Sequence, residues 1–282
     1  MPALWICLGA AGALFLLLVF LVFPAFRRHP ELKRMEGLRI AHRGLHDLTD
    51  GCPENSLAAF RLAAEEGFAI ENDIHLSKDG EVVVFHDDDL KRMCGVDGKV
   101  EEKTLAELKE LKLNGTDERI PTLKECLDAV DGRVPLLIEF KAFSSAGSRE
   151  LCEKANGILS GYEGVYWVQS FYPMCMRWYK KNRPDVCRGQ LASGFYHEKF
   201  PLPLLGTLVF NCLVRPDFVS YDVLTPRNVF LNLCVGLGAQ RVYWTIRSEE
   251  VLLKAEDVYG GKTSIFELFR PDAPDRKNPD KG

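Results

Sequence analysis

The chain has 282 residues and a formal net charge of −4 at pH 7, a length that suits one large domain with an accessory segment. So mild a charge, with no basic stripe against it, does not indicate a nucleic-acid partner. The nine cysteines are scattered and form no CxxC pair. Disulfide frameworks are typical of small secreted domains, so we expect reduced thiols here and no cysteine metal site.

The chain begins with an uncharged apolar segment at residues 4–26, rich in Leu, Phe, Val and Ala. About 20 such residues cross the hydrocarbon core of a bilayer as a helix. A signal peptide has a basic amino-terminal region and an apolar core of about 7–15 residues. This segment lacks the first and exceeds the second. We therefore predict an uncleaved transmembrane anchor at residues 1–26, with cleavage near Ala25 as the alternative.

The charges that flank this segment predict its orientation. No basic side chain precedes it, whereas several follow it: Arg27, Arg28, Lys33, Arg34 and Arg39. The positive-inside rule places these residues, and the domain after them, in the cytoplasm. Reduced cysteines agree with that compartment. We expect a single-pass membrane protein with a cytoplasmic main domain.

After a basic linker at residues 27–37, short apolar runs alternate with helical patterns. The apolar runs predict strands at residues 38–41, 68–73, 82–86, 134–140, 166–171, 187–192, 217–221 and 241–246. Helices are predicted at residues 55–66, 104–111, 122–130 and 148–159, each with a Thr, Ser or Asn to cap it. Between the third and fourth strands, residues 98–121 are expected to form a small excursion with one helix.

Strand–helix alternation is typical of a parallel α/β sheet, and about eight strands in one domain predict a closed TIM (β/α)8 barrel at residues 38–270. The fold class is therefore α/β, preceded by one transmembrane helix and followed by a polar tail at residues 271–282. An uncharged stretch at residues 200–214 is unusually apolar. Two readings stay open for it: a buried barrel helix, or an interfacial helix that rests on the bilayer beside the anchor.

Four of the predicted strands end in residues suited to metal or phosphate chemistry. In a parallel β/α barrel, the active site forms where the strands end, from the loops that follow them. The strand ends provide two imidazoles, three carboxylates, an arginine and a lysine: His42, Arg43, Glu71, Asp73, His86, Glu139 and Lys141. This pattern predicts an enzyme with metal-assisted phosphoryl-transfer chemistry.

The carboxylates are the candidate metal ligands. Glu71 and Asp73 are two residues apart on one strand, so their side chains leave the same face. Glu139 could complete the site from another strand. Close carboxylates repel unless a cation lies between them, and oxygen ligands suit Mg²⁺ or Ca²⁺. The alternative is a network of ion pairs at the barrel rim, with Arg43 and Lys141 as the partners.

His42 and His86 are the candidate proton-transfer groups, because an imidazole titrates near neutral pH. Arg43 offers a planar fork for a phosphate oxygen, and Lys141 a compact positive charge. Glu54 is either a further ligand or the start of a helix. His75 is expected to have left the strand that carries Glu71 and Asp73.

Six short motifs carry the chemistry-bearing residues in a characteristic order and spacing. They are Ala-His-Arg-Gly at 41–44, Pro-Glu-Asn-Ser at 53–56, Glu-Asn-Asp at 71–73, Lys-Asp-Gly at 78–80, Val-Phe-His-Asp at 84–87 and Ile-Glu-Phe-Lys at 138–141. Together they resemble the glycerophosphodiester phosphodiesterase family. The resemblance covers residues 38–246 and is dense up to Phe171. It implies a phosphodiesterase-type TIM barrel that cleaves glycerol-3-phosphate from an alcohol.

By the same resemblance, a divalent cation, Mg²⁺ or Ca²⁺, is held by Glu71, Asp73 and Glu139. His42 and His86 match the family's histidine pair, and Arg43 and Lys141 would hold the phosphate. In one mechanism of the family, the glycerol 2-hydroxyl attacks phosphorus, and water then opens the cyclic intermediate.

The carboxy-terminal part departs from the family pattern. The chain reads Trp-Thr-Ile-Arg at 244–247 where the family often has Trp-Thr-Val-Asn, and Ser-Ile-Phe-Glu-Leu at 264–268 in place of Gly-Ile-Ile-Thr-Asp. We expect neither change to affect the metal or histidine residues, and both to alter the pocket for the alcohol. Arg247 would favour an anionic head group. Trp244 either lines the glycerol pocket or packs in the barrel.

The function predicted from sequence is metal-dependent hydrolysis of glycerophosphodiesters, with lysophospholipids as membrane-derived substrates. A lysophospholipase D or a phospholipase C on the same barrel is the alternative enzyme. An inactive barrel that binds a phosphorylated head group is the alternative from another class. All predicted site residues are present, which favours the enzyme.

Overall fold

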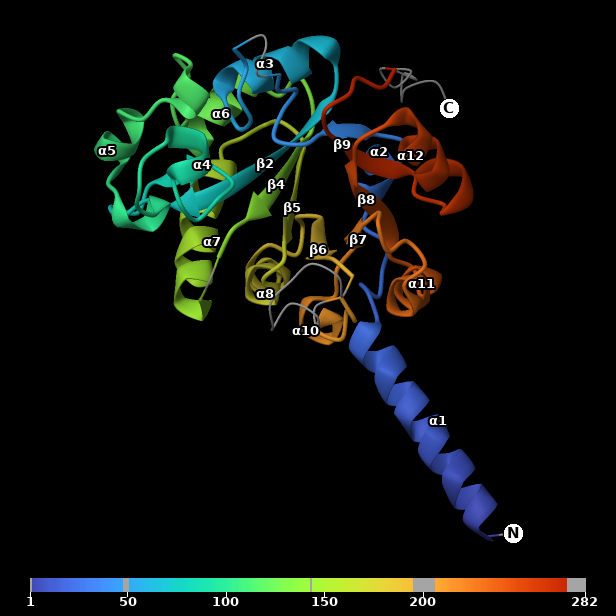
Figure 1. Cartoon of the computed structure of the whole chain (residues 1–282). Coiled ribbons are helices and arrows are strands. Elements are labelled where there is room, and N and C mark those ends of the chain that lie inside the picture. The colour runs from blue at the N-terminus through green and yellow to red at the C-terminus, as the bar shows by residue number, and fades with distance from the viewer. Residues whose placement is uncertain (1, 48–50, 143, 195–205, 273–282) are drawn as a thin grey trace.

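The computed structural model describes residues 2–47, 51–142, 144–194 and 206–272 (Figure 1). Within these ranges the predicted barrel is confirmed. Eight parallel strands follow one another around it, in the sheet order β1-β9-β8-β7-β6-β5-β4-β2, and pairing of β1 with β2 closes the cylinder. The strands are β1 (Arg39–Ala41), β2 (Ala69–Leu76), β4 (Leu136–Phe140), β5 (Tyr166–Ser170), β6 (Arg188–Ala192), β7 (Phe218–Asp222), β8 (Gln240–Ile246) and β9 (Thr263–Phe266).

One predicted barrel strand lies outside the barrel. β3 (Val82–Val84) pairs antiparallel with the end of β2, with Ile74 opposite Val84. Only residues 77–81 connect the two strands. A parallel partner needs a crossover of about a dozen residues or more, so this short turn permits only a hairpin. The eighth barrel strand is instead β9, which was not predicted as a strand.

Three of the predicted helices begin directly after a polar residue expected to cap them. Ser56 caps α3 (Leu57–Glu66), Thr104 caps α5 (Leu105–Lys109) and Thr122 caps α6 (Leu123–Val130). α7 (Ser145–Leu159) begins earlier than predicted, because Ser144 accepts a hydrogen bond from Gly147 N. Helices that were not predicted are α4 (Lys91–Cys94), α8 (Pro173–Asn182), α11 (Val229–Gly236) and α12 (Glu249–Leu253), which runs into a π-helical turn (Lys254–Val258). α10 (Asn211–Val214) lies within the stretch 200–214, where a buried or an interfacial helix was predicted.

The excursion before β4 holds more structure than predicted. Besides α5 it contains two 3₁₀ turns (Val100–Glu102 and Leu113–Gly115), and α4 lies beside it (Figure 1). Apolar side chains from these elements bury one another in a cluster of their own: Val83, Phe85, Leu90, Met93, Val100, Leu108, Leu113 and Ile120. This small cluster holds β3 and the loop after it against the side of the barrel.

A short helix, α2 (Leu32–Met35), covers the end of the barrel at which its strands begin. Leu32 and Met35 are fully buried against residues near the strand starts, including Ala69 and Phe218. Thr263 Oγ1 donates a 2.8 Å hydrogen bond to Met35 O. This helix lies within the range predicted as a basic linker, so part of that range belongs to the barrel's packing.

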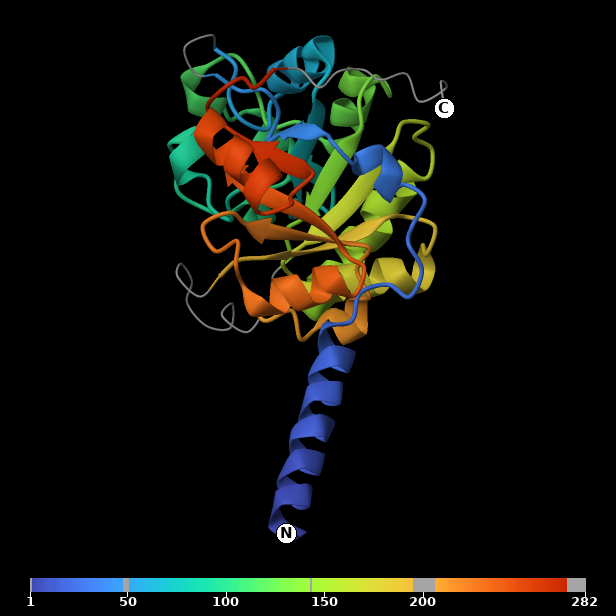
Figure 2. The ribbon, with the colours of Figure 1, turned by 90° about the vertical axis from the view of Figure 1, so that its right-hand side faces the viewer.

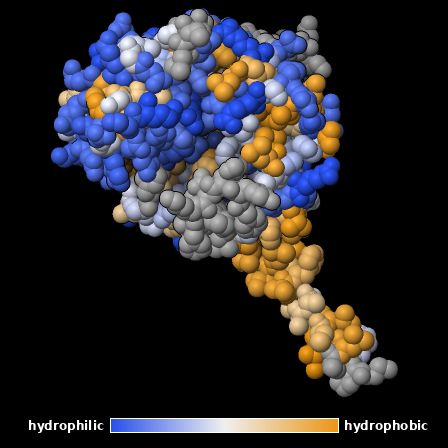
Figure 3. All heavy atoms as spheres, viewed as in Figure 1, coloured by the Kyte–Doolittle hydropathy of each residue, from blue (hydrophilic) through white to orange (hydrophobic). Residues whose placement is uncertain are grey.

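The first helix, α1 (Pro2–Val22), projects away from the barrel and is apolar along its length (Figures 1, 2 and 3). Residues Leu4–Val22 are long and apolar enough to cross a membrane, and little of that stretch is buried in the protein. A signal sequence near the amino terminus would satisfy the same criteria. The helix is therefore a candidate span.

The end of α1 is docked on the barrel. Val22 is fully buried, in the same apolar cluster as Leu208 and Val214. The Arg215 guanidinium donates to Phe23 O at 2.8 Å and to Phe20 O at 3.0 Å.

Of the apolar stretch 200–214, residues 200–205 lie outside the described part of the chain. In the remainder, Asn211 Nδ2 donates to Val22 O at 3.2 Å. The described end of this stretch thus packs on α1.

Gly44 provides a test of the packing beside the site. It has φ +82°, and a Cβ there would lie 2.8 Å from Ala59 Cβ. We expect Gly44→Ala to lower the free energy of unfolding by about 2–4 kcal/mol, because left-handed backbone strain and a clash with α3 add. Denaturant unfolding would measure it. Gly95→Ala is the matched control, since Gly95 has φ +72° with nothing within 4 Å of its Cβ position. Equal losses in both variants would contradict the clash.

Candidate active site

The side chains predicted to meet at the strand ends do meet. β2 and β4 are neighbours, and their register places Asp73 directly opposite Glu139. Glu71 lies two residues before Asp73 on the same face of β2. One oxygen atom from each of the three carboxylates falls within 4.8 Å of the others, and all three side chains are buried. The close approach predicted for Glu71, Asp73 and Glu139 is therefore present in the fold.

The described residues do not fully compensate the negative charge of this cluster. Glu71 Oε1 is buried and has no hydrogen-bond partner among the described residues. Burial, together with repulsion from Asp73 and Glu139, raises the pKa of Glu71 well above its usual value. A buried acceptor without a donor is costly, and a cation among three carboxylate oxygens would remove that cost. The donor set is all oxygen, which fits Mg²⁺ or Ca²⁺.

Lys141 provides one fixed positive charge beside the cluster. Its Nζ lies 2.6 Å from Glu139 Oε1 and 3.1 Å from Asp73 Oδ1. Burial raises the pKa of Asp73, but Lys141, His86 and Arg43 outweigh it and hold that pKa well below the usual range. Two of the three carboxylates are thus paired with Lys141, which leaves Glu71 as the least compensated.

Asn55 is a site residue that the sequence analysis treated only as a helix cap. Its Nδ2 donates to Asp73 Oδ2 at 2.9 Å, and its side chain is buried. Its backbone has φ +54°, in the left-handed region that Asn tolerates better than most residues. Asn55 therefore orients a candidate metal ligand, and Ser56 is the residue that caps α3. The left-handed turn in the Pro-Glu-Asn-Ser motif was not considered from sequence.

Arg43 is held by carboxylates on several sides. Its backbone N–H donates to Glu71 Oε2 at 3.1 Å, and its Nη1 donates to Glu54 Oε1 at 2.7 Å. Glu54 also accepts from Arg92 of α4, so Glu54 joins an ion-pair network and is not part of the acidic cluster. Burial lowers the pKa of Arg43, but Asp73, Glu54 and Glu71 outweigh it and raise that pKa overall. Its phosphate-binding role stays a prediction.

His42 follows β1 and faces the cluster. Its Nε2 lies 4.0 Å from Glu71 Oε2. Its Nδ1 lies 3.1 Å from Glu267 Oε1, and since a carboxylate can only accept, the imidazole is the donor. Burial lowers the pKa of His42 to about 4, and the bond to Glu267 opposes this only in part. The ring is therefore neutral near pH 7.

Glu267 corrects one expectation. The carboxy-terminal departures from the family pattern were expected to leave the histidines untouched, yet Glu267 contacts His42 and also accepts from Arg247 Nε at 2.9 Å. It follows β9 directly, and closure of the barrel brings β9 beside β1. The signal that could have identified Glu267 was a short β-branched and aromatic run ending in a carboxylate, the same pattern as the other site strands.

His86 follows β3, on the hairpin beside β2. Its Nδ1 donates to Asp87 Oδ1 at 2.7 Å, and Arg92 Nε holds Asp87 Oδ2 at 2.6 Å. His75 was predicted to lie beyond the strand, and that prediction is wrong, because His75 lies within β2. Its Nε2 donates to His86 O at 3.2 Å. Burial lowers the pKa of His75 to about 4. His75 therefore supports the loop that carries His86.

Trp244 lies in β8 and is partly buried. It packs edge-to-face on Phe171, with ring centroids 5.6 Å apart. It also contacts the apolar cluster inside the barrel. Packing in the barrel thus accounts for its position, and a role in the glycerol pocket stays a prediction.

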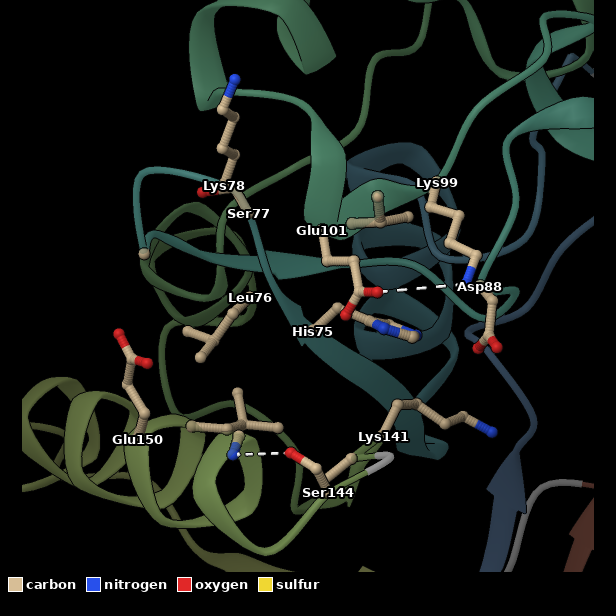
Figure 4. Close-up of a pocket in the computed structure, with 15 residues that line it drawn as sticks. His75, Leu76, Ser77, Lys78, Asp88, Lys99, Glu101, Lys141, Ser144 and Glu150 are labelled. Carbon is tan, nitrogen blue, oxygen red and sulfur yellow. Dashed lines mark hydrogen bonds and ion pairs between the residues drawn. The ribbon is translucent and has the colours of Figure 1, made fainter.

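Cavities lie on two sides of the site. One of about 380 Å³ lies behind Lys141, and Figure 4 shows the Lys141 ammonium turned away from Leu76 and Glu150 on the opposite wall. The other, of about 660 Å³, adjoins Glu267 and is lined by Arg92, Arg247 and Arg270 among others. Each of these arginines pairs with a carboxylate.

Comparison with known proteins agrees with this geometry. The glycerophosphoryl diester phosphodiesterase family matches residues 42–181. Mouse glycerophosphodiester phosphodiesterase 1 is 37% identical over 266 residues, which cover 87% of this chain and 74% of that protein. Rat lysophospholipase D GDPD1 is 30% identical over 88% of each chain.

Among solved structures, the phosphodiesterase OLEI02445 of Oleispira antarctica, in complex with the product sn-glycerol-3-phosphate, has 25% identity and a TM-score of 0.69 over 86% of this chain and 95% of that one. The glycerophosphodiester phosphodiesterase of Thermotoga maritima has 27% identity and a TM-score of 0.63, over 81% of this chain and 94% of that one. The chain belongs to the glycerophosphodiester phosphodiesterase family. The enzyme class and the phosphodiesterase barrel predicted from sequence are thus confirmed.

Replacing Glu71 tests whether the cluster holds a cation. In metal-free protein, Glu71→Gln should keep or raise the melting temperature, because one buried like charge is removed. Added Mg²⁺ or Ca²⁺ should raise the melting temperature of the unmutated protein by several degrees, since a ligand at about 100 times its Kd stabilises by about 2.7 kcal/mol. The variant should lose most of that rise. Glu101→Gln, on an exposed residue, is the control. An undiminished rise in Glu71→Gln would contradict the assignment.

Proposed function

We propose that this chain is a membrane-anchored phosphodiesterase that releases glycerol-3-phosphate from glycerophosphodiesters, with His42 and His86 as the proton-transfer groups. The observation that carries the proposal is a buried carboxylate cluster flanked by two imidazoles. His42 Nε2 lies 4.0 Å from Glu71 Oε2, and His86 directly follows Phe85, whose backbone N–H donates to Asp73 O at 3.0 Å. Cleavage of a phosphodiester needs this combination. Negative charge develops on the phosphoryl oxygens, the attacking hydroxyl loses a proton, and the leaving oxygen gains one.

The two imidazoles suit that exchange. His42 is neutral and donates through Nδ1, so its Nε2 lone pair faces the cluster and can take a proton from an attacking hydroxyl. His86 is partly exposed, with its Nδ1 held by Asp87, and can donate to the leaving alcohol. Arg43 and Lys141 would orient the phosphate. A divalent cation at Glu71, Asp73 and Glu139, Mg²⁺ or Ca²⁺, would neutralise developing charge on the phosphoryl oxygens.

A lysophospholipase D activity is the second candidate. It is supported by 30% identity to rat lysophospholipase D GDPD1 along most of both chains. It also fits an enzyme whose first helix is apolar. In this activity the glycerol carries an acyl chain, and the same phosphate–alcohol bond breaks. The two candidates therefore differ in substrate and share a site.

We further propose that α1 is an uncleaved anchor and that the barrel lies in the cytoplasm. Cleavage near Ala25 would remove Val22 from the buried cluster that contains Leu208 and Val214. It would also strip Arg215 of the carbonyls of Phe20 and Phe23. Exposing apolar surface and leaving the buried guanidinium of Arg215 without acceptors is unfavourable, so the packing favours retention. The described residues 206–214, which contact α1 through Asn211, would lie at the membrane surface.

Removing either histidine tests the catalytic roles. Full-length protein in detergent would receive glycerophosphocholine or lysophosphatidylcholine with Mg²⁺, Ca²⁺ or EDTA. Choline release measures both activities, and mass spectrometry separates glycerol-3-phosphate from lysophosphatidate. His42→Ala and His86→Ala should each lower the rate by about 10²–10⁴-fold, the usual contribution of a proton-transfer group. EDTA should abolish it.

His29→Ala is the matched control for this assay, because His29 is a surface residue bonded to Asp185 O and lies away from the cluster. It should retain full activity. Full activity in His42→Ala or His86→Ala would refute the assigned roles. No release from either substrate by metal-loaded, folded protein would favour a binding barrel instead.

The intact mass of the protein purified from cells tests the anchor. We expect residues 1–26 to be present, because the packing of Val22 and Arg215 requires them. A mature amino terminus near Ala25 would show that the segment is a signal peptide. For orientation, protease added to intact cells should spare the barrel and should digest it only after permeabilisation. Digestion in intact cells would place the domain outside.

A further inference from the structure

Two charged residues that follow neighbouring strands of the barrel are in direct contact. Arg247 Nε donates to Glu267 Oε2 at 2.9 Å, and Arg247 Nη2 lies 2.8 Å from the same oxygen. Arg247 follows β8 and Glu267 follows β9, and these two strands are neighbours in the barrel. Arg247 and Glu267 therefore form one ion pair at the rim of the site.

The two oxygens of Glu267 have different partners. Oε2 accepts from Arg247, and Oε1 accepts from His42 Nδ1 at 3.1 Å. Glu267 is 9% exposed, whereas the Arg247 side chain is 59% exposed. The buried carboxylate thus bridges an outer guanidinium to an imidazole that faces the acidic cluster. Burial raises the pKa of Glu267, but His42, His46 and the Arg247 charge together hold that pKa well below its usual range, so the carboxylate is ionised. His46 Nε2 lies 3.7 Å from Oε1, farther than His42 Nδ1.

This bridge determines which ring nitrogen carries the proton. An ionised carboxylate only accepts, so it requires a proton on Nδ1 of a neutral His42 ring. Nε2 is then left with its lone pair, on the side of the ring that lies 4.0 Å from Glu71 Oε2. A partner on one nitrogen also fixes the ring plane, which keeps the other nitrogen aimed at the same point.

We propose that Glu267, held in place by Arg247, is a positioning residue that fixes the tautomer and the orientation of His42. The inference rests on the proposed catalytic role of His42 and adds to it the reason why its Nε2 is free to take a proton. Arg247 acts through Glu267: by occupying Oε2 it leaves only Oε1 for the imidazole.

The substitution Glu267→Gln distinguishes positioning from a purely structural contact. Arg247 can only donate, so it would draw the amide oxygen of the glutamine toward itself. The amide NH₂ would then face His42 Nδ1 and would force the proton onto Nε2. In the double variant Glu267→Gln/Arg247→Ala, the amide is free to turn its oxygen toward His42, and the original tautomer should return.

Nitrogen NMR of full-length protein in detergent, with ¹⁵N-labelled histidine and no metal, reads the tautomer directly. The His42 signals are assigned by their loss in His42→Asn. We expect Nδ1 to be protonated in the unmutated protein, Nε2 to be protonated in Glu267→Gln, and Nδ1 again in the double variant. Protonated Nε2 in the unmutated protein, or an unchanged tautomer in Glu267→Gln, would overturn the proposal.

Kinetics with glycerophosphocholine provides the second readout. Glu267→Gln should lower kcat by about 10²–10⁴-fold, the range found where a histidine loses its orienting carboxylate, with KM little changed. Glu267→Asp should retain more activity than Glu267→Ala, and the double variant should recover part of the loss. Arg270→Gln is the matched control, because Arg270 lines the same cavity but pairs with Glu66. It should leave kcat unchanged.

The two readouts separate this inference from the proposed function. If His42→Ala loses activity while Glu267→Gln keeps both tautomer and kcat, the positioning role is wrong and the catalytic role of His42 stands. If His42→Ala keeps full activity, the proposed function of His42 fails, and the positioning role fails with it. A rise in KM at constant kcat in Glu267→Gln would indicate substrate binding and would also overturn the proposal.

Discussion

Three carboxylates buried within 4.8 Å of one another are the constraint around which this active site is arranged. Like charges at that distance, away from water, destabilise the fold unless other charges or donors face them. Lys141, from the loop after β4, and the Arg43 backbone and Asn55, both from the loop after β1, supply part of that compensation. Among the described residues the remainder of that compensation is missing, and a cation bound between the carboxylates would supply it.

Local sequence carries much of this arrangement. Glu71 and Asp73 share a face because strands alternate, and the strand ends meet because parallel barrels place them at one rim. Caps at Ser56, Thr104 and Thr122 follow from side-chain chemistry alone. These features depend on neighbours a few residues apart, which is why periodicity and motif spacing could predict them.

The features missed depend on distant residues. The hairpin of β3 with β2 was not predicted, because a short apolar run has the same sequence pattern in a barrel strand and in an edge strand. β9 was missed because its role in the barrel appears only when it pairs with β1 at the other end of the chain. The contact of Glu267 with His42 joins residues 225 apart in sequence, so no local pattern contains it.

The docking of α1 has a mechanical consequence. A span joined to its domain by a loose linker lets the domain swivel and change its height above the bilayer. Here the Arg215 guanidinium donates to the carbonyls of Phe20 and Phe23 at the end of α1. Just beyond the helix, Ala25 N donates to Pro216 O. With α1 in a membrane, the barrel would be held at one tilt and one elevation. The opening of the active site would then stay at a fixed height above the lipid surface. Lateral diffusion of the whole molecule in the membrane would determine how often that opening meets a substrate.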